Sequence, residues 1–312
     1  MRLRTLFLIP STNGLGHARR LIHLVKEWSE FNDILILLTP TQTNQLEEEI
    51  AQVLGVNYKV TILKYDGLGL DGYSHQSSPN HPISLDQDCT RKIMDAELVI
   101  SDNCIWPLYL RPDTVLLGHF SWHDVLPLLS TTKQGIVREI FDLEDVLLKS
   151  AKHVIAIKSF TFGKFANYVN SGSILFPIYK TDSKKKPEIQ EIWYSKGTTG
   201  LNSVEFSTMS SYKLLNRETY FLSNSESIPL GVIGRPGLGT IRDCIEFEVP
   251  FSPLYSGTDV ELQHNVKVLE RASLSETQLQ VGVNSYIFHR FSKKSLIGAT
   301  SFADFNARLN QN

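Results

Sequence analysis

The sequence contains few cysteines and no long apolar run. Its three cysteines, Cys89, Cys104 and Cys244, lie far apart among 312 residues, so neither a disulfide framework nor a paired-cysteine metal site can be drawn. This usage fits a reducing compartment and predicts a cytoplasmic protein. The apolar run at the N-terminus ends at Pro10 after about six residues, short of the roughly 7–15 residues of a signal-peptide core. No apolar stretch approaches the roughly 20 residues of a membrane span, so any membrane contact is expected to be peripheral, at the inner face.

The sequence also lacks an excess of charge of either sign. A formal net charge of -2 gives no electrostatic footprint for nucleic acid, and we expect no nucleic-acid partner. His75 and His81 have no convincing third ligand nearby, so no metal site is predicted. With 42% hydrophobic residues, the 312-residue chain is long enough for two cores of roughly 150 residues each.

Short apolar runs alternate with segments of helical length from the N-terminus onward. Parallel strands need long crossover segments, and continuous apolar runs indicate burial on both sheet faces, so this alternation predicts a doubly wound α/β domain. The expected strands are 3–9, 34–38, 58–63, 98–101, 114–117 and 153–157, and the expected helices are 18–29, 44–54 and 133–149.

The composition changes from apolar to proline- and lysine-rich after this first predicted domain. Residues 176–189 contain two prolines and three consecutive lysines, which predicts a linker; the lysines could instead contact phosphate or lipid headgroups. Beyond it, strands are expected at 192–194, 220–222, 230–233 and 251–254, and helices at 240–247 and 260–272. The sequence therefore predicts two Rossmann-like doubly wound domains, one over residues 1–177 and one over residues 178–312.

A glycine-rich segment joins the first strand to the first helix. Gly14 and Gly16 permit a sharp turn and close approach to a ligand, and the free amides of the helix N-terminus favour an anion. His17 would lie at the mouth of the site, where a histidine can act as a general base, although it could also simply cap the helix. Arg19 and Arg20 could assist with phosphate or be ordinary surface charge.

Polar side chains follow the next two strands of the first domain. Asp102 ends one strand and is a candidate partner for His17, since a carboxylate can fix the tautomer of an imidazole; a strand-end turn is the alternative. His119, Trp122 and Asp124 follow the next strand and suit an acceptor or sugar-stacking surface, with core packing as the alternative for Trp122.

A second glycine-rich segment, in the C-terminal half, precedes another helix. Gly237 and Gly239 permit close approach of the backbone, Thr240 is a good N-cap, and the helix N-terminus would then point at a diphosphate. Asp243 can accept hydrogen bonds from ribose hydroxyls, or merely compensate the helix dipole. Arg235 lies in the same segment, and Glu261 and Asn265 lie at the start of the next helix. Ser195, Gly197 and Thr198 lie in a turn whose amides and hydroxyls could hold phosphate, although a plain turn explains it equally well.

Two segments match known binding motifs but lack the neighbouring secondary structure that those motifs require. The segment 67–72 is a literal GxGxxG, but the residues after it cannot open a helix, so it is expected to be a loop. The triplet Asp86-Gln87-Asp88 is a DxD of the kind that holds a metal diphosphate in another fold, which the surrounding elements do not suggest.

Together the two glycine segments resemble those of GT-B glycosyltransferases related to the lipid-linked peptidoglycan N-acetylglucosaminyltransferase, and of the UDP-sugar hydrolases of nonulosonic acid synthesis. The resemblance rests on GxGHxxR at the first helix and on RPGLGTIRDCIEFEVPFSPLYSGTDVELQHNVKVLE in the C-terminal half. It departs from the family at Asp243, where glutamate is usual, at Glu248, where a G-x-P glycine is usual, and at Leu262, where glutamine is usual.

The resemblance implies two domains that face each other across a cleft, an acceptor-side domain over residues 1–177 and a donor-binding domain over residues 178–312. It also implies an inverting transfer from a UDP-sugar to a hydroxyl acceptor. His17 would be the base, Asp102 its partner, and Asp243 the ribose ligand. Glu261 and Asn265 would face the sugar or the helix-end network, and Arg235, Ser195, Gly197 and Thr198 would belong to the donor-binding loops. The implied enzyme needs neither a metal nor a cofactor, and it acts on a glycan, lipid-linked or small-molecule acceptor in cell-surface polysaccharide or glycoconjugate synthesis. A UDP-sugar hydrolase on the same fold and a non-catalytic nucleotide-binding partner subunit are the alternatives.

Overall fold

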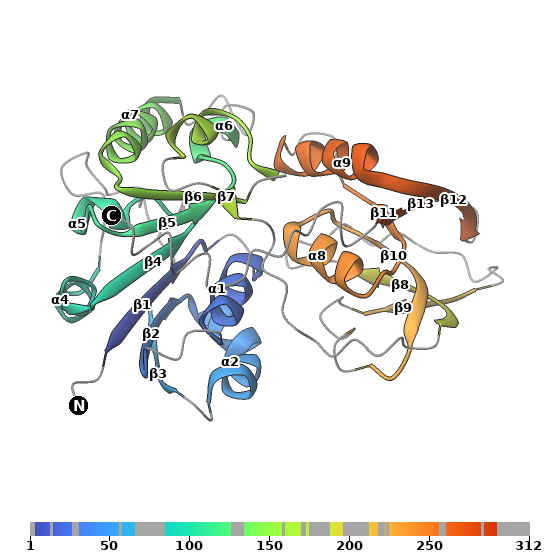
Figure 1. The fold of residues 1–312 in the computed structure, drawn as a ribbon, viewed down its shortest axis with the longest axis horizontal. Coiled ribbons are helices and arrows are strands. Elements are labelled where there is room, and N and C mark those ends of the chain that lie inside the picture. The colour runs from blue at the N-terminus through green and yellow to red at the C-terminus, as the bar shows by residue number, and fades with distance from the viewer. Residues whose placement is uncertain are drawn as a thin grey trace. The chain divides into compact units, whose positions relative to one another are not determined.

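The computed structural model of the protein describes most of the two expected domains (Figure 1). The described residues are 4–12, 15–26, 31–55, 58–65, 85–125, 134–157, 160–169, 173–174, 188–195, 212–217, 222, 225–255, 260–281 and 284–291. They form two compact units, one whose described part runs up to Ile174 and one whose described part begins at Glu188. The predicted boundary between residues 177 and 178 and the GxGxxG at 67–72 lie outside the described residues.

The first unit is a parallel sheet with helices on both faces. Its sheet order is β3-β2-β1-β4-β5-β6-β7. Its strands are β1 (Thr5–Pro10), β2 (Asp33–Leu38), β3 (Lys59–Lys64), β4 (Leu98–Asp102), β5 (Val115–Gly118), β6 (His153–Ile157) and β7 (Ser173–Ile174). Its helices are α1 (Gly16–Lys26), α2 (Pro40–Leu54), α4 (Gln87–Asp95), α5 (Pro107–Leu110), α6 (Trp122–Val125), α7 (Gln134–Ser150) and the 3-10 helix η4 (Lys164–Tyr168).

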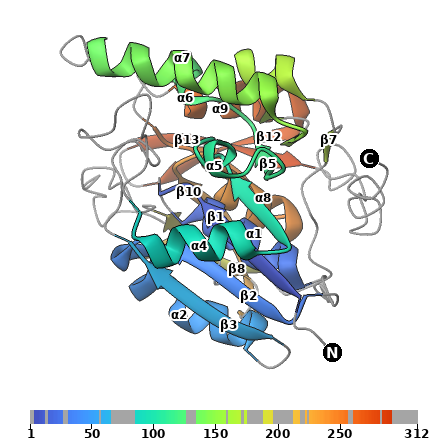
Figure 2. The same ribbon diagram turned by 90° about the vertical axis from the view of Figure 1, so that its left-hand side faces the viewer.

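Apolar side chains from both sheet faces explain this layering. Helices α1 and α2 cover one face, while α4, α5 and α7 cover the other, with α4 in front of β1 and β2 in Figure 2. On the α4 face, Phe7 and Ile9 of β1 pack with Ile93 of α4 and with Trp106, all of them buried. Burial on both faces is the physical reason why these strands are nearly continuous apolar runs.

Strand order reverses between β1 and β4. Both strands run parallel, with Pro10 opposite Asp102, and the backbone N–H of Ser11 donates to the carbonyl oxygen of Asp102 at 2.9 Å. The chain leaves β1 toward one side of the sheet and β4 toward the other, and such switch points are where doubly wound sheets bind ligands. The predicted doubly wound architecture is thus confirmed for this unit.

The DxD triplet forms the beginning of α4. Asp86 is the N-cap, and its side chain accepts a hydrogen bond from the backbone N–H of Cys89 at 2.6 Å. Asp88 lies in the first turn and pairs with Arg91 and Lys92 on the helix surface. Both carboxylates therefore have local roles in the helix.

The second unit is also an α/β layer, with a hairpin added at one edge. Its sheet order is β12-β13-β11-β10-β8-β9, in which the last four strands are parallel and β12 and β13 form an antiparallel hairpin. Its elements are β8 (Glu188–Ser195), β9 (Lys213–Asn216), β10 (Ile228–Gly234), α8 (Leu238–Glu246), β11 (Phe251–Pro253), α9 (Val260–Ala272), β12 (Ser273–Val281) and β13 (Asn284–Phe291). The predicted second Rossmann-like domain is confirmed, whereas the hairpin and β9 were not predicted.

Among the helices that the structure describes, none is long and apolar enough to cross a membrane. The three cysteines are free thiols and are buried.

Candidate functional site

The first candidate site lies at the switch point of the first unit, where α1 begins beside the ends of β1 and β4. Gly16 is the first residue of α1 and is exposed, and an added Cβ there would meet no atom within 4 Å. Its neighbour Gly14 lies outside the described residues. The first turn of α1 therefore has open space beside its backbone, as an incoming ligand requires.

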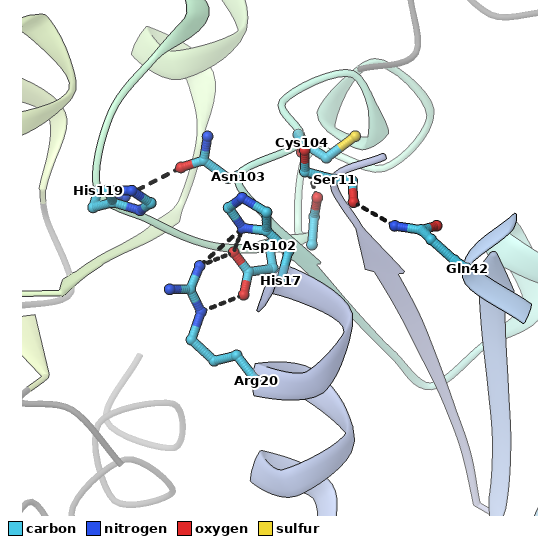
Figure 3. A network of polar contacts seen from close by, with 9 residues as sticks. Ser11, His17, Arg20, Gln42, Asp102, Asn103, Cys104 and His119 are labelled. Atoms are coloured by element: carbon cyan, nitrogen blue, oxygen red, sulfur yellow. Dashed lines mark hydrogen bonds and ion pairs between the residues drawn. The ribbon is translucent and has the colours of Figure 1, made fainter. Parts of the chain in front are cut away.

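His17 and Asp102, 85 residues apart in the sequence, meet at this point. The imidazole Nδ1 of His17 lies 2.9 Å from Oδ1 of Asp102 (Figure 3), and the two residues are 7% and 0% exposed. Arg20, one turn further along α1, donates from Nε and Nη2 to the two oxygens of the same carboxylate. Its Nη2 also lies 3.1 Å from Nδ1 of His17.

The charge of Asp102 decides which nitrogen of His17 carries the proton. Burial alone would raise the pKa of the Asp102 carboxyl, but Arg20 and His17 outweigh burial and hold that pKa below its usual value. An ionised carboxylate only accepts hydrogen bonds, so a hydrogen bond at this contact assigns the proton to Nδ1 of His17, while Nη2 of Arg20 donates to the carboxylate itself. Nε2 is then the nitrogen with a lone pair, which is the arrangement of a general base held by an acidic partner.

A second histidine lies next to this pair. The rings of His17 and His119 stack with centroids 6.0 Å apart and planes at 20°, and His119 is fully buried just beyond β5. The backbone N–H of His119 donates to Oδ1 of Asn103 at 3.2 Å, and Asn103 adopts a positive φ of 56° directly after Asp102. Asparagine tolerates the left-handed backbone conformation better than most residues, and here it turns the chain at the end of β4 so that the Asn103 side chain reaches His119.

Asp124, a second residue predicted for the acceptor surface, has its hydrogen bonds elsewhere. Asp124 accepts hydrogen bonds from the hydroxyl of Ser121 at 2.9 Å and from the backbone N–H of Lys164 at 2.8 Å, so its carboxylate ties α6 to η4. Trp122 begins α6, but its side chain is outside the described part of the structure. His119 is thus the predicted acceptor-side residue that the structure brings to His17.

Arg19 and Arg20 have different partners. Arg19 donates to Glu49 of α2 at 2.8 Å, and His23 contacts the same carboxylate at 3.2 Å, so this group joins α1 to α2. Arg20 is instead 5% exposed and joins the His17–Asp102 pair. Sequence reasoning did not assign Arg20 to this pair, nor Asn103 to the site, because both contacts depend on how α1 and β5 lie against β4.

The second candidate site is at the switch point of the other sheet. Ser195 and Gly234 end the neighbouring parallel strands β8 and β10 and lie opposite each other. An added Cβ at Gly234 would come within 2.7 Å of the Ser195 carbonyl oxygen, so the close pairing requires glycine. Ser195 is 1% exposed, whereas Gly197 and Thr198 fall outside the described residues.

The predicted glycine turn leads directly into α8, which begins earlier than expected. Its N-cap is Gly237 with φ −73°, so Gly239 and Thr240 lie within the first turn; the expectation that Thr240 caps the helix was wrong. No atom lies within 4 Å of a Cβ built on Gly237. Arg235 precedes this turn and is partly exposed. The backbone amides of such a helix start favour an anionic group.

Among the remaining donor candidates, Asn265 contacts this turn directly. Asn265 of α9 is fully buried and donates from Nδ2 to the carbonyl oxygen of Pro236 at 2.9 Å, which ties α9 to the glycine turn. Asp243 is 6% exposed and accepts from Nε of Arg242 at 2.9 Å. Glu261 lies in the first turn of α9. Contacts of these residues with ribose or sugar stay predictions.

Comparison with known proteins gives similarity at the level of fold. No family model matches the chain, and no curated protein matches it. Among solved structures, Phytolacca americana UGT2, complexed with UDP-2-fluoro-glucose and pterostilbene, has a TM-score of 0.53 and 14% identity over 87% of this chain and 84% of its own. A UDP-glucosyltransferase from Polygonum tinctorium has a TM-score of 0.54 and 10% identity over 99% of this chain and 92% of its own.

A third solved structure is more distant. MurG of Acinetobacter baumannii has a TM-score of 0.47 and 15% identity over 86% of this chain and 84% of its own. With the two α/β units described above, the two matches with TM-scores of 0.53 and 0.54 confirm the predicted fold class: the chain has the two-domain Rossmann-like α/β fold of UDP-glycosyltransferases.

Proposed function

We propose that the protein is a glycosyltransferase that moves a sugar from a UDP-sugar to a hydroxyl acceptor with inversion at the anomeric carbon. The observation that carries the proposal is the contact of His17 with the ionised Asp102 at the switch point of the first sheet. The fold shared with solved UDP-glycosyltransferases, one of them complexed with a UDP-sugar analogue, supports the choice of donor.

The first unit supplies the base in this proposal. Nε2 of His17 takes the proton of the acceptor hydroxyl as the hydroxyl oxygen attacks the anomeric carbon, and the bond from that carbon to the diphosphate oxygen breaks. Asp102 accepts the hydrogen bond from Nδ1 and stabilises the imidazolium that forms. UDP leaves with the bonding electron pair.

The second unit supplies the donor site. The amides at the start of α8 bind the diphosphate, and stabilise the charge that develops on it, without a requirement for a metal ion. Asp243 accepts hydrogen bonds from the ribose, and Asn265 keeps the glycine turn in place through Pro236. We place the enzyme in the cytoplasm, at the membrane surface where the acceptor is lipid-linked, in the synthesis of a cell-surface polysaccharide or glycoconjugate.

Replacement of His17 tests the base. We expect His17→Ala to lower kcat by about 10²- to 10⁴-fold, with little change in the KM for the UDP-sugar, because a general base contributes about that much. His23→Ala is the matched control, since His23 is on the same helix and contacts Glu49. Full turnover by His17→Ala would contradict the assignment of His17 as the base.

Replacement of Gly237 tests the donor site. The space around a Cβ at Gly237 and its φ of −73° mean that Gly237→Ala leaves the fold intact. If the diphosphate approaches this backbone, the added methyl weakens UDP-sugar binding, which a thermal-shift titration measures: a ligand at 100 times its Kd stabilises by about 2.7 kcal/mol. Equal shifts for Gly237→Ala and the unmodified protein would contradict this site.

Water in place of the acceptor would make the same site a UDP-sugar hydrolase, since the His17–Asp102 pair can activate either nucleophile. Product analysis separates the two: free sugar formed without an acceptor indicates hydrolysis. Nucleotide binding without any sugar release, across a panel of acceptors, would indicate a non-catalytic partner subunit.

A further inference from the structure

Arg20 is a buried cation that contacts both His17 and Asp102. Its side chain is 6% exposed and reaches from α1 to the carboxylate of Asp102 (Figure 3). Burial of an unpaired guanidinium is costly, so the positive charge of this buried side chain requires a carboxylate as partner. Arg20 is therefore part of the local charge balance of the site.

The geometry of the contact is that of a fork. Nε of Arg20 donates to Oδ2 of Asp102 and Nη2 donates to Oδ1, the oxygen that also accepts from His17. Two parallel hydrogen bonds fix both the position and the plane of a carboxylate. Arg20 thus orients Asp102 independently of the imidazole.

The charged and titratable groups that face His17 lie on β4, on α1 and just beyond β5. Asp102 of β4 contacts Nδ1, Nη2 of Arg20 on α1 lies 3.1 Å from the same nitrogen, and the ring of His119 beyond β5 stacks at 6.0 Å. A lone buried carboxylate would favour the protonated imidazole, whereas a guanidinium at this distance opposes it. The two charges that contact Nδ1 therefore act on this ring in opposite directions.

We propose that Arg20 is a positioning residue that fixes the carboxylate of Asp102 and offsets its negative charge beside Nδ1 of His17, so that loss of either charge changes the protonation of this imidazole. The catalytic meaning of this role rests on the proposed function. Its effect on the protonation of His17 does not, so the two can be tested separately.

The direct test is the NMR titration of labelled histidines, with the His17 signal assigned from a H17Q variant. We expect R20Q to move the midpoint of the His17 titration to higher pH by about 1 unit or more, and D102N to move it to lower pH, because each leaves the opposite charge uncompensated. R20K retains the charge without the fork and should lie between R20Q and the unmodified protein. R19Q is the matched control, since Arg19 pairs with Glu49, and it should leave the midpoint unchanged.

Activity measurements then connect this effect to catalysis. In R20Q, the acidic limb of the pH profile of kcat/KM should move to higher pH, in step with the NMR midpoint of His17. In R20K this limb should lie between those of R20Q and the unmodified protein. If the midpoint of the His17 titration moves as expected but neither the unmodified protein nor any variant transfers sugar, the proposed function is wrong and the role of Arg20 stands. A shared midpoint for R20Q and the unmodified protein, or shifts of R20Q and D102N in the same direction, would overturn the proposal.

Loss of folding in R20Q would be detected by near-ultraviolet circular dichroism, and the double variant R20Q/D102N then replaces it. This variant removes both charges, so its His17 midpoint should lie above that of D102N. If the two midpoints coincide, Arg20 has no influence on His17 and the proposal is wrong.

Discussion

The backbone N–H of Val249 donates to the carbonyl oxygen of Cys244 at 2.9 Å and closes the end of α8. Inside this closure the N–H of Glu248 donates to the carbonyl oxygen of Ile245 at 3.2 Å, and Glu248 has a positive φ of 56°. These two bonds form a Schellman motif, whose left-handed position normally holds glycine because a Cβ is disfavoured there. The glycine expected from the family resemblance thus has a conformational basis, and this chain places glutamate at that position.

Replacement of Glu248 should therefore stabilise the second unit. We expect Glu248→Gly to raise the free energy of unfolding by about 1 kcal/mol, because glycine adopts this backbone conformation without the cost of a Cβ. Chemical denaturation measures the change. Glu248→Ala is the matched control, since it removes the same exposed carboxylate and keeps the Cβ; equal stabilities of the two variants would contradict the conformational explanation.

Replacement of Gly234 should have the opposite effect. The Cβ of Gly234→Ala would lie 2.7 Å from the Ser195 carbonyl oxygen and 3.1 Å from its Cβ, between paired strands that cannot easily separate. We expect a loss of about 1–3 kcal/mol in the free energy of unfolding, as is typical of overpacked positions. Gly237→Ala, three residues later and in open space, should cost less, at most about 1 kcal/mol, because alanine is only a poorer N-cap than glycine and meets no atom; equal losses in both variants would contradict this interpretation.

Asp102 should make the stability of the first unit depend on pH in the acid range. Its folded-state pKa is lowered, against the effect of burial, by Arg20 and His17. The stabilisation from the ionised carboxylate is thus fully present above the unfolded-state pKa of about 3.9 and is lost as pH falls through the lower folded-state value. We expect Asp102→Asn to be less stable by about 3–5 kcal/mol at pH 7, because Arg20 loses its compensating charge.

The gap between Asp102→Asn and the unmodified protein should narrow as the pH falls below about 4, where the carboxylate begins to be protonated in the unfolded state. Denaturant titrations at a series of pH values measure it. Asp88→Asn is the control: hydrogen bonding to Lys92 lowers the pKa of Asp88, but this carboxylate is exposed, so solvent screens its contribution. A constant gap across this range would show that the effect of Asp102 is not electrostatic.

The sequence predicted the order of the elements well where apolar runs were continuous. The expected strand 153–157 and helix 260–272 match β6 and α9, because fully buried strands and amphipathic helices leave strong periodic patterns. The hairpin β12–β13 was missed, because most side chains of β12 are at least partly exposed and the strand lacks an apolar run. The start of α8 was placed too late, because Gly237 caps the helix without a side-chain hydrogen bond.

By itself the sequence determined that the chain forms two α/β units and that His17, Asp102 and the second glycine turn lie at strand and helix ends, since these follow from local periodicity and turn chemistry. Only the tertiary structure decided the partners. Arg20 meets Asp102 across 82 residues, Asn265 reaches Pro236 across 29, and Asp124 ties down Lys164 across 40. Such contacts depend on how each helix packs against its sheet, and no local pattern in the sequence encodes that packing.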